Sequence, residues 1–234
     1  MATKAEERSR ERAPLTRERI LATAVALADA GGVDSISMRR IAQELGVVPM
    51  ALYKHVANKD ELLDGMIDLV VAEIDPPPQG VEWKTAMRER ILAARRVLLR
   101  HPWAARVIQS QGEPTPTVIG YLDSMMGILL AAGFSIDLMH HALHVMGSRI
   151  LGFSQDLFDD TDSMPEEEAK AMWTGLAEVY PNLAALAGAY FEGQVTHDEA
   201  STVGGACDDQ FEFEFALDLI LDGLERLRTA EGSA

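Results

Sequence analysis

The feature that most constrains the fold is the stretch at residues 37–59, where two short helical patterns lie on either side of Gly46. Pro49 stands where the second helix would begin, a position at which its missing N–H costs nothing. The pattern predicts a helix over residues 38–45, a tight turn at Gly46 and a helix over residues 49–55. Four apolar side chains are placed to form a core that the two helices share: Ile41, Leu45, Leu52 and Val56.

The outward face of the second helix is polar, aromatic and basic, and it carries no acidic residue. It consists of Met50, Tyr53, Lys54 and His55. A helix of this size fits the major groove of DNA, where side chains can contact base edges. Arg39 and Lys59 stand at helix starts on either side and are suitably placed to contact phosphates. The alternative is a helix hairpin without a DNA role, in which Tyr53 packs between helices and His55 caps or fills a turn.

Helical patterns dominate the rest of the chain, so the sequence predicts an all-α protein. Even the alternating residues 211–215 continue at helical spacing. Asn58, with Glu61 three residues later, resembles a capping box at the start of a helix that continues through Val70. Residues 75–80, which include three prolines, interrupt regular structure. The other predicted helices cover residues 16–31, 82–100, 102–110, 117–131, 135–158 and 210–228, with a further helix starting at Pro165.

The net charge of −16 is unevenly distributed along the chain. Residues 1–65 contain ten basic and ten acidic residues, whereas the remainder contains eleven basic and twenty-seven acidic ones. The acidic part would be repelled by phosphate and should face away from nucleic acid. Any DNA contact must therefore come from basic groups in the first part, where the arm at residues 4–19 is either a DNA contact or a solvated tail.

Several features indicate a cytoplasmic protein. A single cysteine, Cys207, cannot form an internal disulfide, which points to a reducing compartment. The N-terminal residues are charged and lack the apolar segment of a secretory signal. The longest apolar stretches fall short of the ~20 residues that span a bilayer, so no membrane partner is expected.

The stretch described above resembles the helix-turn-helix of the Tet repressor (TetR) family. The shared pattern is RxxAxxLGV, from Arg39 to Val47, followed by LYxHVxNKxxLLD, from Leu52 to Asp64. The resemblance is strongest over residues 16–66. It implies DNA binding as a homodimer, with operator contacts from Arg39, Pro49, Met50, Ala51, Tyr53, Lys54 and His55 and a phosphate contact from Lys59.

The C-terminal part is similar, less closely, to the tetracycline-repressor subgroup. The resemblance implies an N-terminal three-helix DNA-binding domain and a C-terminal helical domain that binds a ligand and forms the dimer. We divide the chain accordingly into a flexible arm (residues 1–15), a helix-turn-helix domain (16–65) and a ligand-binding and dimerisation domain (66–234). The predicted helix at 135–158 is apolar over a wide arc, which suits burial against both its own subunit and a partner.

The effector is where this chain departs from the subgroup. Tetracycline binding there uses histidines and a threonine around a drug–magnesium chelate, but the aligned positions here are Asp75, Ile108, Gln111 and Ser148. One carboxylate, at Asp156, is a poor magnesium site by itself. We therefore expect a larger, mostly apolar effector with one or two polar anchors, and not tetracycline–magnesium. The ligand-binding positions implied by the resemblance are Arg90, Ala94, Ile108, Gln111, Met125, Ser148 and Asp156; each is alternatively an ordinary core or helix contact.

Two other functions remain open. His140 and His144 are four residues apart on one helix face and could hold a metal in an enzyme, although no third ligand is evident. The second open function is that of a DNA-binding protein that binds no ligand. We expect a transcriptional regulator, a repressor that a small molecule releases from a palindromic operator, with no enzymatic activity, no catalytic residues, no bound metal and no cofactor.

Overall fold

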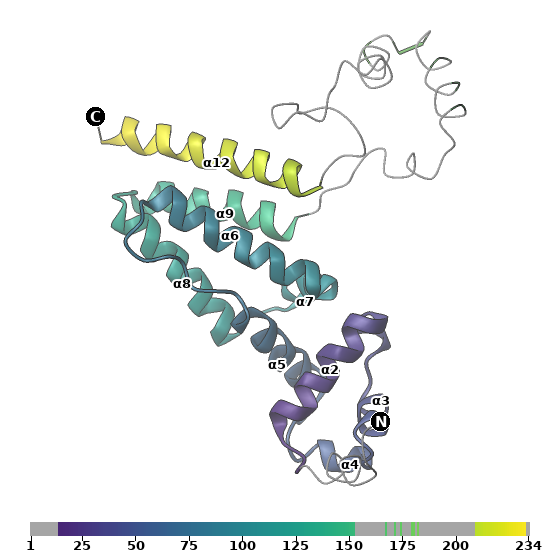
Figure 1. Cartoon of the computed structure of the whole chain (residues 1–234). Helices are drawn as coiled ribbons and strands as arrows, with labels where there is room; N and C mark the ends of the chain where they lie inside the picture. Colours follow the sequence, from purple (N-terminus) through teal and green to yellow (C-terminus); the bar gives the residue numbers. More distant parts are fainter. Residues whose placement is uncertain are drawn as a thin grey trace, which may run out of the picture. The chain divides into compact units, whose positions relative to one another are not determined.

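The computed structural model describes residues 14–152 and 209–232, with isolated positions between them. The chain forms two compact units, Met1–Leu151 with Gly223–Ala234, and Gly152–Asp222, and most of the second unit lies outside the described residues. The described residues are helical and contain no strand, which confirms the predicted all-α class. The helices are drawn in Figure 1.

The N-terminal helices begin at the residues that the sequence predicted. They are α2 (Arg17–Gly31), the 3₁₀ turn η1 (Val33–Ser35), α3 (Met38–Glu44), α4 (Pro49–Leu52) and α5 (Lys59–Ala72) (Figure 1). The side chains of Thr16, Ser37 and Asn58 each accept a hydrogen bond from a backbone N–H three residues later. Such bonds satisfy donors that the first helical turn leaves unpaired, so each helix starts immediately after its capping residue.

The turn between α3 and α4 depends on Gly46, whose φ of 66° is unfavourable for other residues. The Val47 N–H donates to the Ala42 carbonyl at 2.9 Å and closes the turn. Helix α4 is shorter than the predicted 49–55, because the backbone tightens after Leu52. The N–H groups of His55 and Val56 both donate to the Leu52 carbonyl, a mixture of 3₁₀ and α bonding that ends a helix.

Among the described residues, five further helices belong to the first unit entirely or in part, and the sequence located their starts to within a residue or two. They are α6 (Trp83–Arg100), α7 (Pro102–Ser110), α8 (Pro116–Ala131) and α9 (Ile136–Leu151), followed by α12 (Asp209–Glu231), of which the part from Gly223 belongs to this unit. The predicted continuation of α9 to residue 158, the helix starting at Pro165 and Cys207 lie outside the described residues. Among the helices that are described, none has the length and apolar character needed to cross a membrane.

One apolar core joins the N-terminal helices to those that follow. Ile20, Leu62 and Met66 belong to the same buried cluster as Trp103 and Val107 of α7. Helix α5 contributes to this cluster and packs against α2, α7 and α8. Close-packed interiors transmit displacement, so a movement of α7 or α8 would also displace the N-terminal helices that share this core.

Candidate DNA-binding surface and effector cavity

Residues 48–54, which we call the α4 turn, leave large apolar and aromatic side chains exposed to solvent. Met50 is 72% exposed and Tyr53 is 47% exposed, and Val48, Pro49 and Lys54 are exposed with them. Leu52, on the opposite side of α4, is fully buried. The buried side therefore fixes the orientation of the turn while the other side is free to meet a partner.

The remaining predicted DNA contacts lie around this surface. Arg39, in the first turn of α3, and Lys59, in the first turn of α5, are both exposed, whereas Ala51 and His55 are half-buried. Arg17, within the predicted arm at residues 4–19, lies 3.7 Å from Glu61 and forms an exposed ion pair with it. Residues 4–13 of that arm lie outside the described residues.

A cavity in the first unit is lined by residues of the five helices α5, α6, α7, α8 and α9. It contains about 640 Å³ of space not filled by atoms, part of which is open to solvent. Each neighbouring helix contributes to its wall, with Val70 from α5, Val97 from α6, Ile108 from α7, Tyr121 from α8 and Leu143 from α9. Apart from Tyr121, the described residues that line it are aliphatic, methionine or glycine. Such a space is suited to a mostly apolar molecule.

The structure places the seven predicted ligand-binding residues in different surroundings. Ala94, Ile108 and Met125 line the cavity, whereas Arg90, Gln111 and Ser148 are not among its lining residues. Ser148 is exposed, and its hydroxyl donates to the His144 carbonyl at 2.8 Å. Gln111 is half-buried, and its Nε2 has no hydrogen-bond partner among the described residues. Asp156 lies outside the described residues.

Arg90, on α6, is buried beside the cavity and contacts both the segment that follows α5 and helix α8. Its Nη1 donates to the carbonyl oxygens of Ile74, at 3.2 Å, and Asp75, and its Nη2 donates to Ser124 Oγ at 3.3 Å. The guanidinium carbon lies 4.5 Å from the ring centroid of Tyr121, a favourable cation–π distance. Arg90 thus connects the end of α5 to α8, with burial lowering its pKa and the Tyr121 and Asp75 side chains opposing that effect.

Sequence reasoning missed Tyr121, which lines the cavity. Its hydroxyl is buried and has no hydrogen-bond partner among the described residues. Burial raises the pKa of Tyr121 to about 12, with the Arg90 cation opposing the shift. A signal was available, because Tyr121 and the predicted Met125 are four residues apart and so share one helix face.

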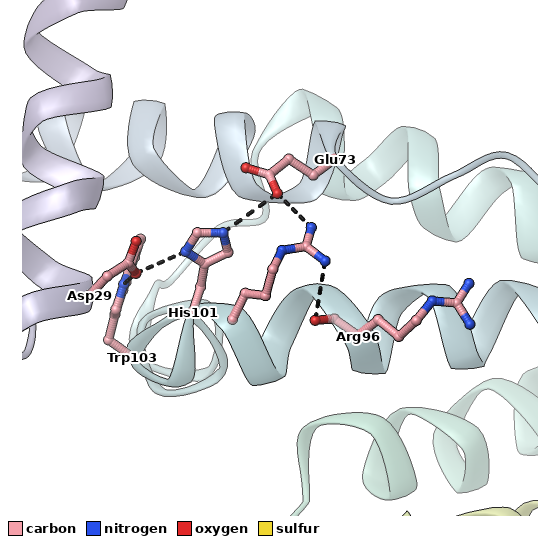
Figure 2. A network of polar contacts seen from close by, with 6 residues as sticks. Asp29, Glu73, Arg96, His101 and Trp103 are labelled. Carbon is pink, nitrogen blue, oxygen red and sulfur yellow. Dashed lines mark hydrogen bonds and ion pairs between the residues drawn. The ribbon is translucent and has the colours of Figure 1, made fainter.

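A polar network connects α2 to the junction between α6 and α7 (Figure 2). Asp29 Oδ1 accepts from Trp103 Nε1 at 2.7 Å and lies 2.8 Å from His101 Nδ1, which must be the donor because a carboxylate offers no proton. Glu73 Oε2, just beyond α5, lies 3.5 Å from His101 Nε2 and 2.6 Å from Arg100 Nη2. The Arg100 hydrogen bond is the largest influence holding the pKa of Glu73 below its usual value.

The histidines of α9 do not form a metal site within the described residues. The rings of His140 and His144 lie on the exposed side of the helix, with centroids 4.6 Å apart. The described part of the chain contains no cluster of three or more histidine, cysteine, aspartate or glutamate side chains that could hold a metal ion. Two imidazoles fall short of the three or four protein ligands that zinc sites use.

Two family models match the chain. The model described as "Bacterial regulatory proteins, tetR family" matches residues 20–66, which contain the α3–α4 pair. The model described as "Tetracyclin repressor-like, C-terminal domain" matches residues 76–228, which contain most of the cavity wall. Together they cover the α3–α4 pair and all the described lining residues of the cavity except Val70, Val71 and Ile74.

Individual relatives are bacterial regulators. An HTH-type transcriptional regulator of Saccharopolyspora erythraea is 36% identical over 130 residues, 55% of this chain and 55% of that protein. The transcriptional repressor DrrR1 of Streptomyces coeruleorubidus is 29% identical over 226 residues, 91% of this chain and 78% of that protein. The solved structure of ActR from Streptomyces coelicolor, in complex with actinorhodin, is 29% identical with a TM-score of 0.70 and covers 92% of this chain and 99% of that chain. The chain thus spans about half of the first relative and most of the other two.

Proposed function

Because the chain belongs to the TetR family of bacterial regulatory proteins, we propose that it is a dimeric transcriptional repressor that a small molecule releases from a palindromic operator. The observation that carries this proposal is that one helix, α5, belongs both to the cavity wall and to the packing of the DNA-binding helices. This helix lines the cavity through Val70 and Val71 and packs against α2 of the helix-turn-helix. We place its action in the cytoplasm, where the DNA is, and propose that residues 16–65 contact DNA while residues 66–234 sense the effector and form the dimer.

The α4 turn would enter the major groove. Tyr53 and Lys54 are exposed there and would contact base edges, together with Met50. Arg39 and Lys59 start neighbouring helices and would bind phosphates on either side, with Pro49, Ala51 and His55 completing the contact surface. Since residues 1–65 are neutral overall, these few cations would supply the attraction to DNA.

Dimerisation would use the apolar residues that α9 and the end of α12 leave exposed. Ile136 is 67% exposed, and Val145 of α9 and Leu227 of α12 are also exposed. A second copy related by a two-fold axis would cover the same residues on both subunits. That symmetry would present two α4 turns to a palindromic site.

The effector would be mostly apolar, and it would not be tetracycline–magnesium. Ile108 is one of the four positions that align with the histidines and the threonine of the tetracycline subgroup, and it lines the cavity as an aliphatic side chain. The carbonyl of Asp75, another of these four, accepts a hydrogen bond from Arg90. ActR has been solved with actinorhodin and with (S)-DNPA, and we propose that this chain likewise binds a small organic molecule in its C-terminal domain.

Release would follow from displacement of α5. A ligand in the cavity would contact Val70, Val71 and Ile74 and move the end of this helix. Since α5 shares a core with α2, the displacement would change the separation of the two DNA-binding heads in the dimer. The ligand can only release DNA to the extent that it binds the displaced state more tightly.

A gel-shift titration on the DNA upstream of its own gene tests this function. We expect a complex at low salt that survives excess unrelated DNA and weakens as salt rises. Variant Met50→Ala/Tyr53→Ala serves as the comparison, since it changes the exposed side of α4 and leaves Leu52 intact. The absence of any sequence-preferring complex at low salt would contradict the proposal.

A further inference from the structure

Among the described residues, the cavity wall contains one side chain with a nitrogen or oxygen atom. Of the fifteen described residues that line the cavity, Tyr121 carries such an atom, and the others offer aliphatic surface, a methionine sulfur or backbone. Polar groups in a largely apolar pocket fix the orientation of a ligand and select it. At this wall the Tyr121 hydroxyl is therefore the side-chain group that could bind a polar atom of a ligand, and other side chains cover it in the structure.

Among the described residues, no charged side chain lines the cavity. The nearest cation shown by the contacts of Tyr121 is Arg90, which is not a lining residue; its Nη1 and Nη2 are engaged with the carbonyls of Ile74 and Asp75 and with Ser124 Oγ, and its Nε is buried without a partner among the described residues. An ionised ligand group would lose its hydration on entry, and the described wall offers it no side chain of opposite charge. The part of the ligand that is buried here should therefore be uncharged.

The hydroxyl of Tyr121 is available as a donor. It is buried and has no hydrogen-bond partner among the described residues, although a buried hydroxyl normally has one. Since burial raises the pKa of this group to about 12, the hydroxyl keeps its proton at neutral pH. An unpaired buried donor favours any ligand that brings an acceptor to it.

We propose that Tyr121 selects the effector, and that the effector is an uncharged, mostly apolar molecule with a hydrogen-bond acceptor, such as a carbonyl oxygen, that binds the Tyr121 hydroxyl. This inference rests on the proposed function of the cavity as an effector site. To reach the hydroxyl, the ligand must displace the side chains that cover it. The Arg90 guanidinium lies over the same ring and donates to the Ile74 carbonyl, so it would transmit that displacement to the segment that follows α5.

A matched pair of probes tests the proposal. 9-Fluorenone and fluorene share a ring system and differ by one carbonyl acceptor, and calorimetric titration gives the dissociation constant of each. We expect the full-length protein to bind fluorenone about tenfold more tightly than fluorene, the preference that one hydrogen bond provides. In Tyr121→Phe the two probes should bind with nearly equal affinity, because the variant keeps the ring and loses the donor. Tyr180→Phe, at a tyrosine that is 52% exposed and outside the cavity, is the control and should keep the preference.

The charged analogue 9-fluorenone-2-carboxylate tests the second half of the proposal and should bind at least about tenfold more weakly than fluorenone. Equal binding of fluorenone and fluorene to the unaltered protein, an undiminished preference in Tyr121→Phe, no binding of either probe, or tighter binding of the carboxylate would each overturn the proposal. A gel shift on the upstream DNA, run in parallel, distinguishes failure of the Tyr121 proposal from failure of the proposed regulatory function. An intact DNA complex with any of those results removes the role of Tyr121 alone, whereas loss of the complex removes the regulatory function itself.

Discussion

Neighbouring residues of the α4 turn have opposite environments. Leu52 is fully buried, while Met50 and Tyr53, on either side of it in sequence, are exposed. Substitutions at Leu52 would therefore damage folding, and substitutions at the exposed positions should alter only what the protein binds. This separation allows the proposed DNA contacts to be tested one residue at a time.

Lys54 and Lys59 should differ in what they contribute to DNA binding. For Lys54→Ala we expect operator binding to weaken by about 1–3 kcal/mol while binding to unrelated DNA changes less, because this residue is assigned to base edges. For Lys59→Ala we expect both to weaken similarly, because a phosphate contact is indifferent to sequence. Fluorescence anisotropy on operator and scrambled duplexes measures both effects, and identical behaviour of the two variants would contradict the assignment.

Glu73 should make stability depend on acidity. The Arg100 hydrogen bond lowers the pKa of Glu73 below the ordinary value of 4.5, so its stabilisation is complete above that value and is lost as pH falls through the lowered pKa. Both partners are substantially exposed, so the contribution should be below about 1 kcal/mol. Thermal unfolding of Glu73→Gln between about pH 6 and pH 3 should show a smaller loss of stability on acidification than the unaltered protein. A loss equal to or larger than that of the unaltered protein, with Glu44→Gln as control, would refute this.

At the scale of elements, Asp29 joins α2 to α7. It is the acceptor for Trp103 Nε1 and His101 Nδ1, and both of those side chains are buried. Asp29→Ala would leave both donors unpaired and should lower the free energy of unfolding by about 2–4 kcal/mol. In a double-mutant cycle with Trp103→Phe, the combined loss should be smaller than the sum of the single losses by at least about 0.5 kcal/mol. Strict additivity in denaturant unfolding would show that the Asp29–Trp103 bond contributes nothing.

Helices α2 and α5 approach closely at Gly65. A methyl group there would lie 2.7 Å from Leu21 Cδ2 and 3.1 Å from Arg17 Nη2. For Gly65→Ala we expect overpacking of about 1–3 kcal/mol to outweigh the gain of up to about 1 kcal/mol from better helix propensity. Gly127→Ala in α8, where nothing lies within 4 Å, should instead stabilise the protein. Urea unfolding gives the free energy of unfolding of both variants. A Gly65→Ala variant more stable than the unaltered protein would mean that the side chains of α2 move aside at little cost.

Local patterns predicted most of the elements, because caps and apolar spacing are short-range signals. Thr16, Ser37 and Asn58 each start a helix as their residue types suggest. The end of α4 was wrong by about a turn, because the switch to 3₁₀ bonding at His55 has no equally specific local signal.

The sites were less predictable than the helices, since their partners are distant in sequence. Asp29 and Trp103 are 74 residues apart, and no local pattern joins them. Arg90 was predicted as a ligand contact, and the structure shows its guanidinium engaged with the end of α5 and with Ser124. The unpaired hydroxyl of Tyr121 became visible only once the surrounding helices were in place.

At the scale of the whole molecule, the chain has a neutral N-terminal part, to which we assign DNA binding, and a strongly acidic remainder. The net charge of −16 belongs to the residues after 65, so attraction to DNA would come from a few exposed cations. Two copies joined through α9 and α12 would double those cations and hold two α4 turns at a fixed separation. Under the proposed function, dimer formation would thus be needed both for affinity and for selection of a palindrome.

Hydroxyl-radical footprinting of the full-length protein on the DNA upstream of its gene tests the central claim most directly. We expect two protected half-sites related by a two-fold axis, with their centres separated by about one helical turn or a multiple of it. Lys54→Ala should lose both protected regions together, because each subunit of the dimer presents the same turn. A single protected half-site, or uniform protection without sequence preference, would contradict the assignment of the α4 turn as the DNA-contacting element of a symmetric dimer.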